Sequence, residues 1–457
     1  MVDTPRIVIA GTHSGVGKTT IASGLMAALA AMGHEVAPFK VGPDFIDPSY
    51  HAIATDRPGR NLDAFMSGPE MIGPLFAHGA RGADIAVIEG VMGLFDGKGG
   101  GGELASTAHI AKLLDAPVLL VVDARAMARS AAAMVLGYMT FDDRVNVAGV
   151  ILNRVGSSVH ERMLREAIEP LGVPVLGIVR RNEKLETPGR HLGLIPASER
   201  TSDARGALRS TGEIIARSLD LDAVMRLARS AESLHGEPWS PEASDEDRAP
   251  GVRVAVAGGA SFSFLYRENL ELLEGAGAEV VYFDPTTAED LPPDSDLLYL
   301  GGGFPETYAE VLSLNERLRS QVRDFASSGR PVVAECGGLL YLCRDLDGHP
   351  MCGVLDAEAR MTSRLTLGYR EASAPANSPL AQAGTTVRGH EFHYSAIEPG
   401  AGETSAWNLT GRGSEGFISG GVHASYLHLH WAATPGLARN IARYAARMAK
   451  KPVGARA

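Results

Sequence analysis

Short apolar runs alternate with amphipathic segments over residues 1–231. The apolar runs are RIVIAG, EVAPFKV, DIAVIEG, APVLLVVDA, VAGVILNRV and VPVLGIV, and the segments between them have the spacing of helices. Near-continuous apolar strands that are separated by helices are typical of a parallel sheet covered on both faces. We therefore predict an α/β domain with a parallel sheet over residues 1–231.

A second alternating series begins after residue 250. Its apolar runs are VRVAVAGG, AEVVYFD, DLLYLGGG and PVVAECGG, and residues 352–425 are richer in β-strand and turn signals. Between the two series, residues 232–250 are rich in proline, serine and acidic residues and lack periodicity, which is typical of a linker. The pattern predicts a second α/β domain over 251–447, followed by a tail over 448–457.

Length and composition narrow the class of protein. A chain of 457 residues is too long for one ordinary core, and its 45% hydrophobic and 21% charged residues are typical of a soluble globular protein. The net charge of -11 argues against a nucleic-acid-binding protein, which normally has a basic face. Arginines that cluster locally can still hold an anionic small molecule.

Cysteine usage and the N-terminal segment indicate a cytoplasmic protein. Three cysteines, Cys336, Cys343 and Cys352, are too few for a disulfide framework in a chain of this size, and the lack of a C-x-x-C pair among them argues against a structural zinc site. The chain enters a predicted strand at RIVIAGTH, with no charged leader and apolar signal region before it. No apolar run approaches the ~18–20 residues of a membrane span, so we expect no membrane partner.

The segment GTHSGVGKTT follows the first predicted strand and opens the first predicted helix. Backbone N–H groups of such a loop, together with the positive end of the helix, bind phosphates. The lysine can reach the terminal phosphate oxygens and the following threonine can ligate magnesium. We therefore expect ATP and Mg2+ to bind here. The predicted nucleotide-binding residues are Thr12, Gly15, Val16, Gly17, Lys18, Thr19 and Thr20, with Lys40 from the next strand.

The spacing of this loop departs from the usual P-loop. Five residues separate Gly11 from Gly17, where the usual pattern has four. This G-T-x-x-x-V-G-K-T form resembles that of dethiobiotin synthetase, which phosphorylates a carboxylate. Partition and septum-placement ATPases carry a signature lysine five positions before the loop lysine, where this chain has His13. The resemblance therefore implies activation of a carboxylate.

Charged residues follow two further predicted strands. FKVGPDFIDPSYH contains Lys40, Asp44 and Asp47, and IEGVMGLFDG begins just before Glu89. Ligands of open parallel sheets bind beyond the carboxyl ends of the strands, so Lys40, Asp44 and Glu89 are candidates to surround phosphates and metal. The predicted metal ligands are Thr19, Asp44 and Glu89. Asp44 and Asp47 can instead be turn residues beside prolines.

RPGRNLD adds two arginines near these segments, in a loop without helical spacing. Guanidinium groups of Arg57 and Arg60 could hold substrate carboxylates bidentately. Together with Asp44 they are candidate substrate-binding residues. The alternative is that both are ordinary surface arginines.

In PVVAECGGLLYL, a strand-like run meets a helix-like run at Cys336. A thiol at the apex of such a turn is expected to be solvent-accessible, and a helix N-terminus behind it lowers the thiol pKa. The two glycines that follow permit a strained backbone and leave room for an acyl group. The alternative is a small cysteine that closes a strand in a core.

An activated cysteine needs a base and an oxyanion hole. In GVHASYLHLHW, His428 and His430 alternate along a strand and face opposite ways, so one of them can point at Cys336, while His423 is more distant. The run YLGGGFPETY can offer backbone N–H groups to an oxyanion, or it can be a plain strand-to-helix turn. The predicted oxyanion residues are Gly302, Gly303 and Gly337.

These features resemble the class I glutamine amidotransferases, in which an elbow cysteine and a late histidine release ammonia from glutamine. Ala334 replaces the first glycine of the family's G-x-C-x-G elbow, and His430 stands where the family has a glutamate. The cobyric-acid-type subgroup lacks that glutamate and has a Y-x-H pattern, which Tyr426 and His428 match. The resemblance implies Cys336 as nucleophile and His428 as base.

Nearly the whole chain resembles the cobyrinic acid a,c-diamide synthase family, including its hydrogenobyrinic acid form. The most specific segments are FKVGPDFIDPSYH, RPGRNLD, EGVMGLFDG, GGGFPE, AECGGLLYL, LTLGYR, GHEFHYS and ASYLHLH. The resemblance implies amidation of the a and c side chains of a corrinoid through acyl phosphates, with ATP and glutamine as co-substrates, and implies that Asp96 orients the substrate or the incoming ammonia. A synthase acting on another tetrapyrrole, such as nickel-sirohydrochlorin, and a partition-type ATPase switch are the alternatives. The sequence leaves open whether the ring carries cobalt and whether the chain forms a homodimer.

Overall fold

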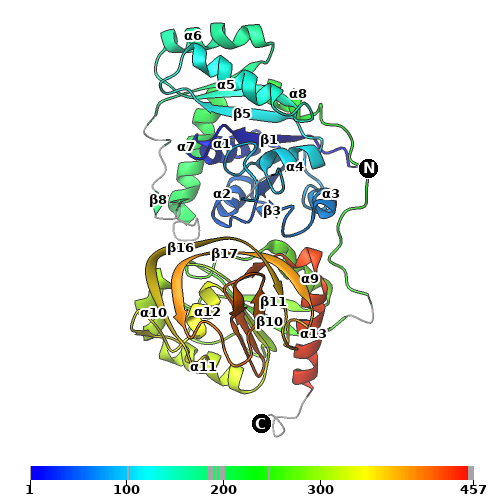
Figure 1. The fold of residues 1–457 in the computed structure, drawn as a ribbon, viewed down its shortest axis with the longest axis vertical. Helices are drawn as coiled ribbons and strands as arrows, with labels where there is room; N and C mark the ends of the chain where they lie inside the picture. The colour runs from blue at the N-terminus through cyan, green and yellow to red at the C-terminus, as the bar shows by residue number, and fades with distance from the viewer. Residues whose placement is uncertain are drawn as a thin grey trace. The chain divides into compact units, whose positions relative to one another are not determined.

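The computed structural model divides into two compact units, Met1–Ser240 and Pro241–Ala457. It describes residues 2–99, 102–182, 185, 189–190, 193–194, 201–244 and 248–450. The division falls within the predicted linker, of which residues 245–247 lie outside the described residues, as does the predicted tail from residue 451 onward. Each unit is described by itself (Figure 1).

The first unit is built on a seven-stranded sheet in the order β3-β2-β4-β1-β5-β6-β7, in which every neighbouring pair is parallel. The six apolar runs form six of these strands, so the predicted parallel α/β domain is confirmed. The strands are β1 (Arg6–Gly11), β2 (Val36–Val41), β3 (Arg60–Leu62), β4 (Ile85–Glu89), β5 (Val118–Asp123), β6 (Val147–Val155) and β7 (Val175–Arg180), with β8 (Gly189–Arg190) and β9 (Gly193–Leu194) as a separate pair.

Helices cover the sheet of the first unit (Figure 1). They are α1 (Lys18–Ala31), α2 (Ile46–Thr55), α3 (Pro69–Gly79), α4 (Thr107–Leu113), α5 (Arg129–Thr140), α6 (Ser158–Ile168), η1 (Glu169–Leu171), α7 (Thr201–Ser218) and α8 (Leu221–Ala228). Ile21, Leu25 and Leu29 of α1 are fully buried in the core. Gly24 lets α7 approach α1 closely, because a Cβ atom at this position would lie 2.5 Å from Ile215.

The second unit contains two sheets. One has the order β11-β10-β12-β13-β21-β20, and its pairs are parallel except for β20 with β21. The other has the order β15-β14-β16-β17-β22, with β18 paired to β16 and β19 paired to β18. The strands are β10 (Arg253–Ala257), β11 (Glu279–Phe283), β12 (Leu297–Leu300), β13 (Val332–Glu335), β14 (Asp345–Leu346), β15 (His349–Pro350), β16 (Glu358–Ser373), β17 (Thr386–Glu398), β18 (Trp407–Leu409), β19 (Gly413–Glu415), β20 (Phe417–Ser419), β21 (Val422–Ser425) and β22 (His428–Leu429).

The four apolar runs of the second half form β10 to β13, which confirms the second α/β domain. Its helices are α9 (Arg267–Gly275), η5 (Pro305–Tyr308), α10 (Ala309–Leu314), α11 (Glu316–Ser327), α12 (Gly337–Leu342), η6 (Trp431–Ala433) and α13 (Gly436–Ala449). The stretch with β-strand and turn signals contains the long antiparallel pair β16 and β17, which curves across the unit (Figure 1).

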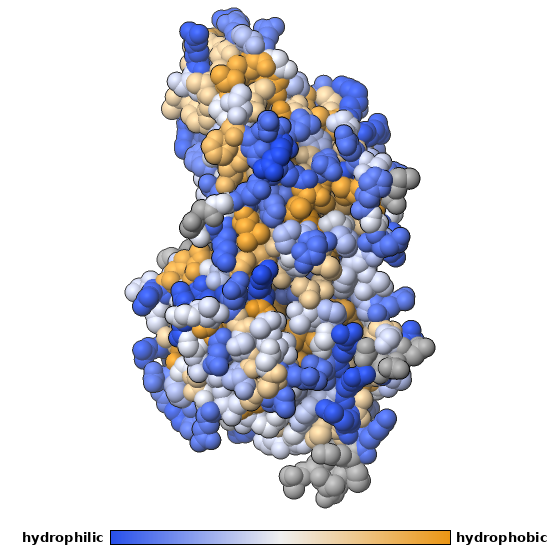
Figure 2. All heavy atoms as spheres, turned by 45° about the vertical axis from the view of Figure 1, so that its right-hand side comes forward, coloured by the Kyte–Doolittle hydropathy of each residue, from blue (hydrophilic) through white to orange (hydrophobic). Residues whose placement is uncertain are grey.

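Within the described part of the chain, the helices all lack the length and apolarity needed to cross a membrane. On the face that Figure 2 shows, hydrophilic residues are interspersed with apolar ones over both units.

Candidate active sites

The phosphate loop lies between β1 and α1. Gly15 and Gly17 adopt positive φ angles of 82° and 95°, which glycine adopts with little strain. Asn153, near the end of β6, donates a 2.7 Å hydrogen bond from Nδ2 to the carbonyl of Val16, and a Cβ atom at Gly17 would lie 2.4 Å from that nitrogen. Asn153 therefore supports the loop. Asn153 was not among the predicted site residues, although a polar residue in the apolar run VAGVILNRV was an available signal, and it is buried.

Lys18 is buried in the same loop and directs its ammonium group at backbone carbonyls. Nζ donates hydrogen bonds to the carbonyls of Met92 and, at 3.3 Å, of His13. Burial and the nearby charge of Lys40 lower the pKa of Lys18 to about 8. A phosphate that replaces these carbonyls would offer the ammonium group full negative charges instead of partial ones.

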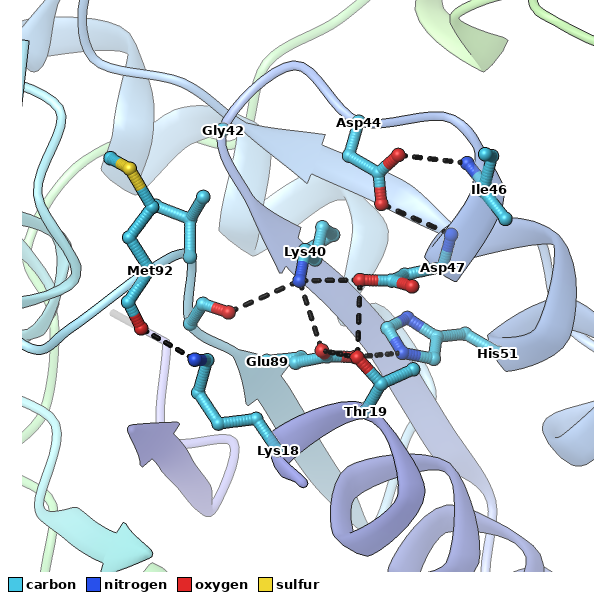
Figure 3. A network of polar contacts seen from close by, with 12 residues as sticks. Lys18, Thr19, Lys40, Gly42, Asp44, Ile46, Asp47, His51, Glu89 and Met92 are labelled. Atoms are coloured by element: carbon cyan, nitrogen blue, oxygen red, sulfur yellow. Dashed lines mark hydrogen bonds and ion pairs between the residues drawn. The ribbon is translucent and has the colours of Figure 1, made fainter. Parts of the chain in front are cut away.

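A buried polar cluster lies beside the loop (Figure 3). Lys40 and Glu89 are register partners on β2 and β4, and Nζ lies 2.9 Å from Oε1 of Glu89 and 2.6 Å from Oδ2 of Asp47. Thr19 donates from Oγ1 to Glu89 at 2.6 Å, and Nε2 of His51 lies 2.7 Å from the other carboxylate oxygen. Glu89 and His51 are fully buried. The cluster thus joins β2, β4, α1 and α2.

The charges of this cluster depend on one another. Burial alone raises the pKa of Glu89, but Lys40 and His51 outweigh it and hold this pKa well below its usual range. Burial likewise opposes the charge of Lys40, whereas Asp47 and Glu89 raise its pKa. Burial and the neighbouring Glu89 raise the pKa of Asp47 well above its usual value. An ionised Glu89 opposite a protonated Lys40 is therefore the stable pair.

Asp44, which was predicted near the phosphates, and Asp96, for which the resemblance implied a role in orienting the substrate or ammonia, both make turn contacts. The two carboxylate oxygens of Asp44 each accept a 3.1 Å hydrogen bond from a backbone N–H, of Ile46 and of Asp47, at the start of α2. Oδ2 of Asp96 accepts one from Gly93 at 2.9 Å. Asp47, and not Asp44, makes the direct contact with Lys40 (Figure 3).

The arginine segment supports the chain around the cluster. Arg57 donates to the carbonyls of Gly79 and Arg81, at 3.2 and 2.8 Å. Arg60 is buried within strand β3, so its predicted position in a loop was wrong. Asn61 donates to the carbonyls of Gly42 and Asp44 at 2.8 and 2.7 Å. Arg57 also pairs with Glu35, with Nη1 3.7 Å from Oε2, and Asn61 holds the turn that carries Asp44.

Two cavities adjoin the phosphate loop, and Arg125 lines both of them. One of about 740 Å³ is lined by Gly17, Thr20, Asn153, Arg154 and Arg181, among others. The other, of about 480 Å³, is lined by Thr12, His13, Asp123, Arg125 and Tyr138, among others. The phosphate loop can therefore contact ligands in both cavities.

Cys336 lies where β13 ends and α12 begins, with φ 47° and ψ -98°. This strained conformation in a residue other than glycine is common at functional sites. The predicted accessibility and lowered pKa of the thiol were wrong. Cys336 is 5% exposed, and burial, reinforced by Glu306, raises its pKa far above the usual value. The six-residue helix α12 does not offset this burial.

The predicted oxyanion glycines and His428 lie close together around the elbow. A Cβ atom at Gly337 would lie 2.9 Å from the backbone nitrogen of Gly303, and one at Gly302 would lie 2.4 Å from Cε1 of His428. Cys336 itself donates its backbone N–H to Ser425 at 2.8 Å, at the end of β21. The elbow, the glycine turn after β12 and the imidazole of His428 therefore form one compact site.

His428 and His430 face different parts of the second unit. Nδ1 of His428 lies 3.9 Å from Oε2 of Glu335, the residue before Cys336. Nε2 of His430 lies 3.4 Å from Oε2 of Glu268 on α9, and its ring contacts Tyr266. His428 thus faces the elbow and His430 faces α9.

The segments LTLGYR and GHEFHYS pair with each other in β16 and β17. Arg370 and Glu391 form a buried ion pair across these strands. His390 packs edge-on against His428, with ring centroids 4.9 Å apart. The two segments therefore form one wall of the cysteine site.

Comparisons with known proteins agree with these two sites. A family model described as the CobQ/CobB/MinD/ParA nucleotide binding domain matches residues 7–195, and one described as the CobB/CobQ-like glutamine amidotransferase domain matches residues 253–436. The chain is thus a nucleotide-binding protein with its own glutamine amidotransferase domain.

Individual relatives match over nearly the full length. The hydrogenobyrinate a,c-diamide synthase of Streptomyces coelicolor is 57% identical, over 95% of this chain and 96% of the relative. The hydrogenobyrinate a,c-diamide synthase of Thermobifida fusca is 52% identical, over 97% of this chain and 96% of the relative. The cobyrinate a,c-diamide synthase of Syntrophotalea carbinolica is 46% identical, over 95% of this chain and 97% of the relative. The chain belongs to the family of hydrogenobyrinate and cobyrinate a,c-diamide synthases.

Proposed function

We propose that this enzyme amidates the a and c side-chain carboxylates of hydrogenobyrinic acid in cobalamin biosynthesis, with ATP and glutamine as co-substrates. The observation that carries the proposal is the full-length similarity to synthases of that name, at 57% and 52% identity. The relatives named for cobyrinate are less similar, at 46% and 44%. The higher sequence identity to the hydrogenobyrinate synthases favours the cobalt-free ring as substrate.

The first unit activates the carboxylate. Lys18 moves from the carbonyl of Met92 to the terminal phosphate of ATP, and the loop N–H groups hold the remaining phosphates. The substrate carboxylate oxygen attacks the terminal phosphorus, the bond to ADP breaks, and an acyl phosphate forms. Such a transfer depends on positioning and charge neutralisation, which Lys18 supplies.

The polar cluster is suited to magnesium. Thr19, Asp47 and Glu89 offer a hydroxyl and two carboxylates, which are the hard oxygen ligands that Mg2+ prefers. Bound Mg2+ would neutralise charge on the phosphates. Lys40 holds the two carboxylates together and offsets their repulsion. Asp47 thus takes the ligand role that the sequence suggested for Asp44.

The second unit supplies ammonia. His428 removes the thiol proton of Cys336, and the thiolate attacks the side-chain carbonyl carbon of glutamine. Backbone N–H groups of Gly303 and Gly337 stabilise the oxyanion. The imidazolium then donates its proton to the departing nitrogen, so ammonia leaves and a thioester remains. Water hydrolyses the thioester to glutamate, and ammonia displaces phosphate from the acyl phosphate to form the amide.

The buried thiol is consistent with this order of events. Because burial raises the pKa of Cys336, the thiol stays protonated until glutamine and His428 are both in place. A thiol that ionises only with substrate present would limit unproductive reactions of the free enzyme. This differs from the accessible thiolate that the sequence predicted.

Product analysis tests the substrate. Purified enzyme with ATP, Mg2+ and glutamine is incubated separately with hydrogenobyrinic acid, cobyrinic acid and nickel-sirohydrochlorin, and the products are identified by mass spectrometry. We expect two amidations of hydrogenobyrinic acid at the highest kcat/KM. Preferential amidation of either other ring would reject the proposed substrate while leaving the chemistry intact.

A further inference from the structure

The cysteine site contains a buried acid whose role the family resemblance does not assign. Glu335 ends strand β13 directly before Cys336 and is 3% exposed. Its Oε2 lies 3.9 Å from Nδ1 of His428, which is 1% exposed. A histidine acting as base through Nε2 needs an acceptor at Nδ1 to hold its tautomer and orientation. In this chain His430 stands where related amidotransferases have that acceptor, and His430 faces α9.

We propose that Glu335 is the positioning acid of the glutaminase site, so that one strand end supplies both the nucleophile and the group that orients its base. The proposal rests on the proposed roles of Cys336 and His428. Glu335 accepts a hydrogen bond from Nδ1–H of His428 and stabilises the imidazolium. It takes no proton, because the thiol proton passes to Nε2 and from there to the leaving ammonia.

Neighbouring residues hold Glu335 in place. Its carboxyl group accepts a hydrogen bond from the backbone of Leu429 and lies 3.4 Å from the hydroxyl of Tyr299. Asn269 donates at 3.0 Å to that hydroxyl and at 2.8 Å to the carbonyl of Leu429. Glu335 is thus tied through Leu429 to the strand β22 that carries His428. A positioning group needs this kind of supporting shell.

Charge and distance both suit a contact that tightens during the reaction. Burial raises the pKa of Glu335 to about 8, so only a share of the enzyme carries the ionised carboxylate at neutral pH, and this is the form that stabilises the imidazolium. An imidazolium formed 3.9 Å away favours the carboxylate strongly in a buried site. The 3.9 Å separation exceeds a hydrogen bond, but catalytic hydrogen bonds are often long before substrate binds.

The chain provides a matched control. Glu268 and His430 form a second buried acid–histidine pair, 3.4 Å apart, and Glu268 is 2% exposed. If only burial and packing mattered, Glu268→Gln would disturb the unit at least as much as Glu335→Gln, because its pair is the closer one. If Glu335 positions the base, only Glu335→Gln slows glutamine hydrolysis.

The test measures kcat and KM for glutamine hydrolysis in full-length wild type, Glu335→Gln, Glu335→Asp, Glu268→Gln and Cys336→Ser. For Glu335→Gln we expect kcat to fall roughly 10- to 1,000-fold, less than the ~10⁴-fold loss when a directly bonded triad acid becomes an amide. Its KM stays within about threefold, because an interaction that strengthens in the transition state acts on kcat. Glu335→Asp recovers part of the loss.

The outcomes separate the two proposals. A Glu335→Gln enzyme with wild-type kcat overturns the role of Glu335 and leaves the glutaminase intact. An equal loss in Glu268→Gln, or a rise in KM that accounts for the whole effect, also overturns it in favour of a structural role. Glutamine hydrolysis that persists in Cys336→Ser would instead overturn the proposed function itself.

Discussion

Substitution of Glu89 by glutamine tests whether the buried cluster stabilises the first unit. Glu89 is fully buried and makes contacts of 2.9, 2.7 and 2.6 Å with Lys40, His51 and Thr19. Glutamine keeps one acceptor oxygen and nearly the same shape, but loses the charge opposite Lys40 and His51. The variant therefore isolates the electrostatic contribution.

The magnitude follows from what Lys40 retains. Breaking a buried ion pair costs ~3–5 kcal/mol when the remaining charge has no partner. Lys40 keeps Asp47 at 2.6 Å and the carbonyl of Gly90 at 3.1 Å. We therefore expect a cost of roughly 2–3 kcal/mol. At roughly 2–4 °C per kcal/mol for a unit of 240 residues, Tm falls by roughly 4–12 °C.

Calorimetry of the full chain measures this loss. The transition of the first unit is identified as the one whose Tm rises when nucleotide is added. The pKa of Glu89 is held low, so its charge stabilises the folded unit at neutral pH, and this contribution is lost as the pH falls below the usual glutamate pKa of ~4.3. Glu103→Gln is the control, because it removes a half-exposed partner of Lys112, and such pairs contribute ~0–1 kcal/mol. A Tm for Glu89→Gln within a degree or so of that of Glu103→Gln would refute the reasoning.

Two further predictions concern the phosphate loop and the elbow. Because burial lowers the pKa of Lys18 to about 8 and phosphate binds its protonated form, ATP affinity is constant below this pKa and weakens above it, by up to ~10-fold per pH unit. Isothermal titration from pH 6.5 to 9.5 measures this, and a flat profile would contradict it. Gly302→Ala places a methyl group 2.4 Å from Cε1 of His428, so glutamine-dependent amidation should fall at least ~100-fold while ammonium-dependent amidation persists. Equal loss with both nitrogen sources would argue against a local effect.

The parallel sheet and the main cluster residues were predictable because both follow from local patterns. Continuous apolar runs identified the strands, and Lys40 and Glu89 stand at the carboxyl ends of neighbouring ones. Asp47 and His51 depend instead on where α2 begins. They lie four residues apart on this helix and so face the same side. The prolines near them favoured a turn, so the sequence did not indicate this helical spacing.

The state of the thiol was not predictable from its own segment. The strand, elbow and helix around Cys336 were apparent, but the accessibility of the thiol depends on packing by distant segments. His390, from β17, packs on His428, and Ser425 of β21 bonds the cysteine backbone. Glu335 went unassigned for the same reason, because its partner His428 is far along the chain.

The most direct test of the two-site account compares nitrogen sources. Wild type, Cys336→Ser and Lys18→Ala are each given hydrogenobyrinic acid and ATP with either glutamine or an ammonium salt, and the diamide is quantified. We expect diamide from both sources in wild type, from ammonium alone in Cys336→Ser, and from neither in Lys18→Ala. Glutamine-dependent diamide from Cys336→Ser, or loss of the ammonium-dependent product in that variant, would contradict it.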